Sequence, residues 1–144
     1  MNRRTFLKSA SVLLALLPLR ALAAVWNKPA FEATKPEAAL QGLGFNQPQL
    51  SSEIDLIAPD FAENGAIVQI EVYSHIPNTE AIAILADKNP TSLIANFMFG
   101  NGALPKLITR VKLAENCELK VIVKAGDKYF EASKNVQVAV GGCG

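Results

Sequence analysis

Hydrophobic and polar residues alternate with a period of two through most of the chain after residue 50. Apolar side chains at every second position line one face of a strand, as Val68, Ile70 and Val72 do between polar neighbours. Pro, Asn, Asp and Gly cluster in the gaps between such runs, where they favour turns. The pattern predicts about seven strands, at residues 52–56, 68–73, 81–85, 92–99, 107–113, 117–125 and 129–140.

Short strands at intervals of roughly 8–12 residues, each with one apolar face, are typical of an all-β sandwich or barrel. About seven of them in a single domain predict an immunoglobulin-like antiparallel β-sandwich. Only the N-terminal part of this domain has a helical composition, and there we expect one short helix at residues 35–40. That helix should end at Gly42 or Gly44 and pack through Leu40 and Phe31.

The segment before this helix, residues 25–31, is expected to be irregular. Its Pro29 disfavours helical geometry at the residue that precedes it.

The first 23 residues have the composition of an export signal. A charged start is followed by an apolar stretch at residues 9–19 and by small residues at Ala21 and Ala23. The paired Arg3 and Arg4 before Phe-Leu-Lys resemble a twin-arginine signal, which implies export of a folded protein to the periplasm. The apolar stretch is shorter than the about 17–25 residues of a membrane span. We expect cleavage after Ala23; an uncleaved interfacial anchor is the alternative.

Cleavage would leave one domain at residues 24–140 and a terminal arm at residues 141–144. It removes four of the 14 basic residues and none of the 13 acidic ones, so the mature charge is −3. A nucleic-acid partner would need a basic face, which this balance disfavours.

The chain ends in Gly141-Gly142-Cys143-Gly144, which puts a thiol on a glycine tether. Glycine has the widest backbone freedom, so we expect a flexible arm. A fully extended chain spans at most about 3.3–3.6 Å per residue, so the thiol can stand roughly 10 Å from Val140. A frayed terminus without function is the alternative. Against it, an exposed free thiol in an oxidising compartment is prone to oxidation, which makes its retention purposeful.

The second cysteine, Cys117, falls in a strand pattern in which it shares one face with Leu119 and Val121. We expect it to be a buried or half-buried structural residue. A permanent disulfide between Cys117 and Cys143 is the alternative, and it would fix the arm that the glycines free.

Other chemistry has weak support in the sequence. The candidate metal ligands are His75, Met98, Cys117 and Cys143, without the spacing of a metal-binding motif. A Cys–His pair needs both groups within hydrogen-bond reach, which a glycine tether does not provide. We therefore expect no enzyme activity, no metal and no cofactor. The carboxylate of Gly144 disfavours the nearby thiolate, so we expect a sluggish thiol that partner proteins activate.

Several segments together resemble the SoxY family of sulfur carriers from the periplasmic thiosulfate-oxidising Sox system. They are the twin-arginine signal, the mature start at residues 25–31, the segment at residues 58–66 and the terminal Gly141-Gly142-Cys143-Gly144. The family pattern usually ends Gly-Gly-Cys-Gly-Gly, and here the final glycine is missing. The shorter end leaves the cysteine in place and brings the carboxylate closer to it.

The resemblance implies that Cys143 is the covalent attachment point for sulfur, as a cysteine S-thiosulfonate or persulfide. It implies that the cytochrome SoxAX loads thiosulfate, that SoxB releases sulfate and that SoxCD, where present, oxidises the remaining sulfur. It implies a heterodimer with SoxZ, a second β-sandwich. A Cys143–Cys143 disulfide between two copies would be a resting form. An exported interaction module and a copper chaperone remain as alternative functions.

Overall fold

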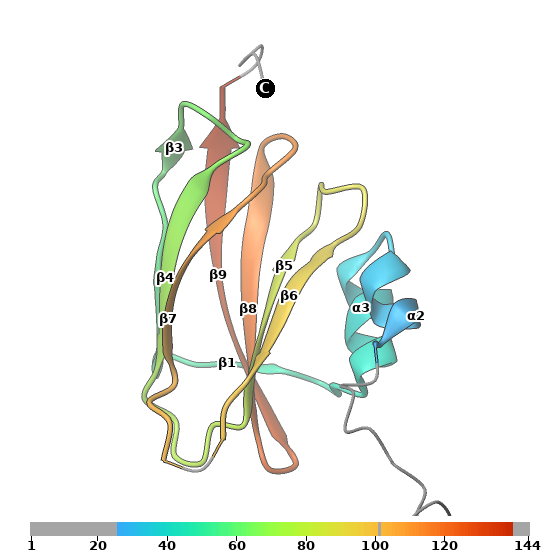
Figure 1. The fold of residues 1–144 in the computed structure, drawn as a ribbon, viewed down its shortest axis with the longest axis vertical. Coiled ribbons are helices and arrows are strands. Elements are labelled where there is room, and N and C mark those ends of the chain that lie inside the picture. Colours follow the sequence, from blue (N-terminus) through green and yellow to red (C-terminus); the bar gives the residue numbers. More distant parts are fainter. Residues whose placement is uncertain (1–25, 101, 140–144) are drawn as a thin grey trace, which may run out of the picture.

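The computed structural model describes residues 26–100 and 102–139 of the chain. The signal expected at residues 1–23 and the arm expected at residues 141–144 lie outside these ranges. The described residues form two short helices followed by strands (Figure 1). The elements are α2 (Lys28–Glu32), α3 (Pro36–Leu43), β1 (Gln49–Leu50), β2 (Ile54–Ile57), β3 (Phe61–Ala62), β4 (Val68–Ser74), β5 (Ala81–Ala86), β6 (Leu93–Met98), β7 (Lys106–Val111), β8 (Cys117–Ala125) and β9 (Lys128–Val138).

The strands form two sheets that face one another, which confirms the predicted β-sandwich. The larger sheet has the order β1-β9-β8-β5-β6, with β3 added alongside β9, and the smaller sheet has the order β2-β4-β7. All seven predicted strands are present and pair antiparallel. The two-residue strands β1 and β3 were not predicted, and both pair with β9 in parallel.

The main core lies between the two sheets and consists almost entirely of the alternating aliphatic residues. Ile70 and Val72 from the smaller sheet are fully buried, as are Ile82, Ile84 and Val121 from the larger one. Burying a side chain of this size stabilises the fold by about 1.5–3 kcal/mol. The alternation in the sequence therefore orients each strand so that its apolar side faces the other sheet.

A second core lies between the larger sheet and the two helices. Every residue of β5 is buried, because its outward side is covered by helix residues such as Ala30, Ala39 and Leu40. Figure 1 shows α2 and α3 beside β5 and β6. The helix predicted at residues 35–40 is confirmed as α3, which ends at Gly44 in the left-handed conformation that glycine favours.

The prediction of an irregular segment around Pro29 is wrong. Pro29 lies in the first turn of α2, where a missing N–H costs nothing and the fixed φ suits a helix. Asn27 caps this helix by accepting a hydrogen bond from the Ala30 amide at 3.1 Å. The prediction weighed only the restriction on the residue before proline.

None of the helices in the described part of the chain is long and apolar enough to cross a membrane.

Candidate functional site

The predicted site residues Gly141, Gly142, Cys143 and Gly144 lie outside the described residues. The structure does describe the strand that leads to them, β9, and the chain up to Ala139 (Figure 1). The end of β9 together with Ala139, residues 136–139, is the root of the predicted arm.

One side of the root is held by β3. Phe61 and Ala62 pair in parallel with Gln137 and Val138. The Gln137 amide donates to the Asp60 carbonyl at 2.9 Å, and the Ala139 amide donates to the Ala62 carbonyl at 3.0 Å. This two-residue strand thus fixes the chain up to the last described residue.

The other side of the root is held by the beginning of β8. Cys117 pairs with Val136 at the end of the ladder between β8 and β9. Beyond this pair, β9 is bonded by the Asn116 side chain instead of by a backbone group of β8. The Asn116 Oδ1 accepts a hydrogen bond from the Val138 amide at 2.7 Å. The root is consequently bonded on both sides, and Val136 and Val138 are buried in the main core.

Two further contacts hold the segments around the root together. Gly65 packs so closely that an added Cβ would lie 2.5 Å from the Leu113 carbonyl oxygen and 2.6 Å from Val138 Cγ1. Lys134 Nζ lies 3.0 Å from Asp60 Oδ1 and also donates to the Ala58 carbonyl. The residues that precede β3 are in this way attached to β9 as well.

Cys117 is buried and is a free cysteine in the described part of the chain, as expected of a structural residue. The pKa of its thiol is raised from 9.0 to about 11, mainly by burial and in addition by the nearby carboxylates of Asp87 and Glu115. The thiolate is the reactive form of cysteine, so this setting makes Cys117 a poor nucleophile at neutral pH.

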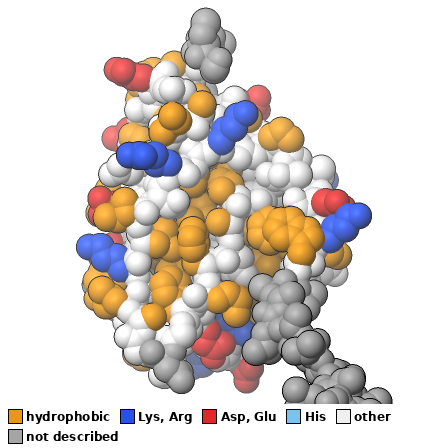
Figure 2. All heavy atoms as spheres, viewed as in Figure 1, with side chains coloured by type: hydrophobic (Ala, Val, Ile, Leu, Met, Phe, Trp, Pro, Cys, Tyr) orange, Lys and Arg blue, Asp and Glu red, His pale blue; other side chains and the backbone are white. Residues whose placement is uncertain are grey.

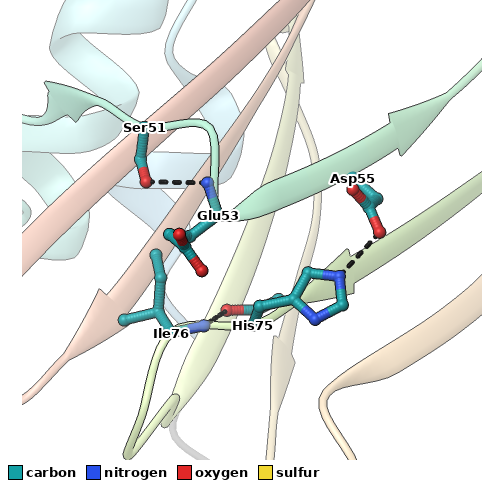
Figure 3. Close-up of polar contacts among 6 residues, drawn as sticks. Ser51, Glu53, Asp55, His75 and Ile76 are labelled. Carbon is teal, nitrogen blue, oxygen red and sulfur yellow. Dashed lines mark hydrogen bonds and ion pairs between the residues drawn. The ribbon is translucent and has the colours of Figure 1, made fainter.

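His75 and Asp55 form a polar pair on neighbouring positions of the smaller sheet (Figure 3). The imidazole Nε2 lies 2.7 Å from Asp55 Oδ2, both side chains are about half exposed, and the ring tilts against Tyr73 with centroids 4.2 Å apart. His75 follows Ser74, the last residue of β4, whereas Val68 is the first residue of this strand and lies at the end of the sandwich that holds the root. Since a strand rises about 3.3 Å per residue, the polar pair is roughly 20 Å from the root of the arm.

The candidate metal ligands are therefore not brought together. His75 lies at one end of the sandwich and Cys117 at the other, and the described residues contain no group of three or more His, Cys, Asp or Glu side chains that could hold a metal ion. Met98 is 77% exposed on the edge strand β6. A copper site that uses His75 together with Cys117 is incompatible with these positions.

A surface hollow of about 610 Å³ lies next to His75. Its serine and threonine, Ser74 and Thr79, bond to each other at 2.7 Å, and Thr79 also donates to the Ile76 carbonyl at 2.8 Å. These bonds stabilise the turn between β4 and β5, and neither hydroxyl contacts the imidazole within the described residues. The hollow offers no serine or threonine paired with a base.

Comparison with solved structures places the chain in a functional class. It superimposes with a TM-score of 0.67 on the sulfur carrier protein SoxY from Chlorobium limicola f thiosulfatophilum, at 31% identity over 74% of this chain and 98% of that one. The fold and this likeness define a sulfur carrier rather than an enzyme. A family model described as sulfur oxidation protein SoxY matches residues 41–143. The chain belongs to the SoxY family, whose members act with partner proteins of the Sox system.

A second solved structure shares the sandwich fold alone. This is the superoxide reductase (neelaredoxin) from Ignicoccus hospitalis, with a TM-score of 0.52 and 18% identity over 60% of this chain and 80% of that one. No curated protein sequence matches the chain.

Sequence reasoning identified the strand before the arm and missed the residues that hold it. The alternating pattern of β8 begins only at Cys117, so it gives no sign that the Asn116 side chain accepts a hydrogen bond from the Val138 amide. The close approach of Gly65 to Val138 joins positions far apart in the chain, which a local pattern does not report. Segment 58–66 had signalled the family and contains β3.

Proposed function

We propose that Cys143 carries sulfur intermediates of thiosulfate oxidation as a covalent cargo in the periplasm. The observation that carries the proposal is the bonded root of β9, from which the chain runs within four residues to Cys143. The matched family region, residues 41–143, extends through the same cysteine. A fixed root with a glycine tether gives a thiol that can reach into a partner while its origin stays in place.

Loading is an oxidative coupling. The Cys143 thiol loses its proton, its Sγ forms a bond to the outer sulfur of thiosulfate, and two electrons leave. The product is a cysteine S-thiosulfonate, held by a sulfur–sulfur bond and not by a thioether. A c-type cytochrome of the SoxAX kind accepts the two electrons.

Release is a hydrolysis. Water attacks the sulfonate sulfur of the S-thiosulfonate, the bond between that sulfur and the sulfane sulfur breaks, and sulfate and two protons leave. A persulfide remains on Cys143. A hydrolase of the SoxB kind performs this step, and SoxCD, where present, oxidises the remaining sulfane sulfur. The carrier itself supplies the attachment point and the docking surfaces.

Cys117 supports the selectivity of this scheme. Its buried thiol, with a pKa of about 11, does not compete with Cys143 for sulfur at neutral pH. One reactive sulfur per carrier then receives the cargo.

Export and assembly complete the proposal. The twin-arginine signal delivers the folded chain to the periplasm, and cleavage after Ala23 leaves all of the described domain, which starts at Trp26, in the mature protein. SoxZ, which would travel without a signal of its own, forms the heterodimer. Periplasmic fractionation and sequencing of the mature N-terminus test this part, with Ala24 as the expected first residue.

The loading experiment compares two cysteine variants. The mature chain is incubated with SoxZ, SoxAX, oxidised cytochrome and thiosulfate, and its intact mass is measured. We expect a thiosulfonate adduct on the unmodified chain and on Cys117→Ala, and no adduct on Cys143→Ser. An adduct on Cys143→Ser would contradict the proposal, as would a thiosulfonate found on the Cys117 peptide. Unchanged partner binding with no adduct on any form would favour the interaction module.

A further inference from the structure

One bond at the root of the arm depends on the identity of a side chain. Successive backbone amides of a strand point to opposite sides, and the amides of Gln137 and Ala139 bond to backbone carbonyls in and beside β3. A carbonyl of this kind is supplied by every residue. The Val138 amide points the other way and bonds to the Asn116 side chain at 2.7 Å. Substitution of Asn116 can therefore change one side of the root and leave the other side as it is.

The turn that carries Asn116 is attached to two other segments. It spans residues 112–116, between β7 and β8. The Leu113 amide donates to the Gly65 carbonyl at 2.8 Å. From the turn between β5 and β6, Asn89 donates to one carbonyl of residues 112–116 at 2.8 Å and accepts from one of their amides at 2.9 Å. These bonds hold the turn on both sides.

The strand that follows Asn116 is held as well. Cys117 is buried and pairs with Val136 across the ladder. The Glu118 amide donates to Asp87 Oδ1 at 2.8 Å, on the side of β8 that faces β5. The backbone of Asn116 thus lies between two fixed segments, and its Oδ1 is presented to β9 from a defined place.

We propose that Asn116 is a positioning residue for Cys143. By holding the Val138 amide, five residues before the thiol in the sequence, it sets the direction in which the chain leaves the sandwich. A tethered group reacts in proportion to the time that it spends in productive geometry, and added freedom at the start of the tether lowers that share. The inference rests on the proposed function, which assigns the sulfur cargo to Cys143.

This role distinguishes enzymes from small reagents. A small alkylating reagent diffuses to the thiol from any direction. An enzyme that docks on the sandwich meets the thiol only where the arm delivers it, so its rate depends on the direction of the root. Loss of the Asn116 bond should therefore slow loading by SoxAX without changing the chemical reactivity of Cys143.

The test compares loading rates of the mature chain with SoxZ, SoxAX, oxidised cytochrome and thiosulfate, read from the intact mass after timed quenching. For Asn116→Ala we expect kcat/KM for the carrier to fall by about threefold to tenfold. The KM for thiosulfate, the final loaded fraction and the alkylation rate of Cys143 by iodoacetamide should not change. Because Asn116 is exposed, its truncation opens no cavity in the core. Asn116→Asp keeps an oxygen acceptor and should restore the loading rate.

The matched control is Thr79→Ala, which removes side-chain hydrogen bonds to Ser74 and to the Ile76 carbonyl at the opposite end of the sandwich. It should load at the rate of the unmodified chain, because the root is untouched. Circular dichroism of each variant confirms that the sandwich is folded.

Three results would overturn the inference and leave the proposed function intact. They are loading of Asn116→Ala at the unmodified rate, equal slowing by Thr79→Ala, and no recovery of the rate in Asn116→Asp. An unmodified chain that takes up no thiosulfate would instead overturn the proposed function, and the inference with it.

Discussion

The two cysteines of this chain, Cys117 and Cys143, differ in the residues next to them. Cys117 is 6% exposed at the start of β8, with apolar residues around it and two carboxylates nearby. Cys143 stands between glycines at the end of the sequence. Since thiolate formation and access decide reactivity, the setting of Cys117 suits packing, and the proposed function assigns the chemistry to Cys143.

The first prediction at this scale concerns alkylation of Cys117. In the folded protein at pH 8 its thiol should react with iodoacetamide at least tenfold more slowly than it does in denaturant, because its pKa is near 11 and the sulfur is buried. Peptide mass spectrometry after timed quenching gives the rate for each cysteine. Equal labelling of Cys117 in the folded and unfolded protein would contradict the structure.

A second prediction follows from the same pKa. The folded state holds the Cys117 proton up to about pH 11 and the unfolded state releases it near 9.0, so stability falls as pH rises through this window. The loss is at most about 3 kcal/mol, since one pKa unit corresponds to about 1.36 kcal/mol. Denaturant unfolding at several pH values measures it. Cys117→Ala should remove this component; an identical pH dependence in that variant would contradict the assignment.

Burial of Cys117 could be predicted from its alternation with Leu119 and Val121, whereas its electrostatic setting could not. Asp87 lies 30 residues earlier in the chain, and its Oδ1 accepts a hydrogen bond from the Glu118 amide at 2.8 Å. This contact depends on how β5 and β8 pair. A one-dimensional pattern reports which face a residue occupies, and a partner from another strand appears only once the sheet is assembled.

At the scale of elements, β9 is the strand that leads to the proposed carrier arm. It is the longest strand, from Lys128 to Val138, and bonds to β8 along its length, to β1 near its start and to β3 at its end. A strand flanked on both sides has few free backbone groups and a high cost of local opening. The arm therefore begins from one of the best-supported parts of the fold.

Close packing at Gly65 leads to the third prediction. Gly65→Ala would place a methyl group against the Leu113 carbonyl and Val138, so the backbone must shift, and overpacking of this kind costs about 1–3 kcal/mol. Thermal unfolding measures the change. Gly100→Ala is the matched control, because its added Cβ meets nothing within 4 Å and should leave the melting temperature nearly unchanged. Equal effects of the two substitutions would contradict the packing described.

The Asn116 side chain gives the fourth prediction. Asn116→Ala removes the acceptor for the Val138 amide and should lower stability by about 1 kcal/mol. Amide hydrogen exchange at Val138 should accelerate more than at residues in the middle of β9. Asn135→Ala, an exposed position of the same strand, serves as the control and should leave exchange at Val138 unchanged. No acceleration at Val138 in the first variant would contradict the bond.

The elements that sequence reasoning found and missed differ in length and period. Alternation over four or more residues located every strand of the sandwich proper. A two-residue strand such as β3 has no period to detect, and it exists because the segment after Ala58 lies beside β9. Helix α2 was missed because Pro29 can either break a helix or begin one, and the Asn27 cap decides in favour of beginning.

At the scale of the whole molecule, different sides of the sandwich serve different purposes. Helices α2 and α3 cover one face of the larger sheet, and the root of the arm occupies one end. Within the described residues, β6 pairs only with β5 and β7 only with β4, so each sheet ends in a strand with one unpaired edge.

The central claim is that sulfur is carried on Cys143, and the most direct measurement is the mass of the C-terminal peptide from cells oxidising thiosulfate. The protein is isolated from the periplasmic fraction without reductant and digested. We predict that the peptide containing Cys143 carries thiosulfonate or added sulfur, that reduction removes it, and that the peptide containing Cys117 is unmodified. A Cys143 peptide with no added sulfur under these conditions, or sulfur found on Cys117 instead, would contradict the account.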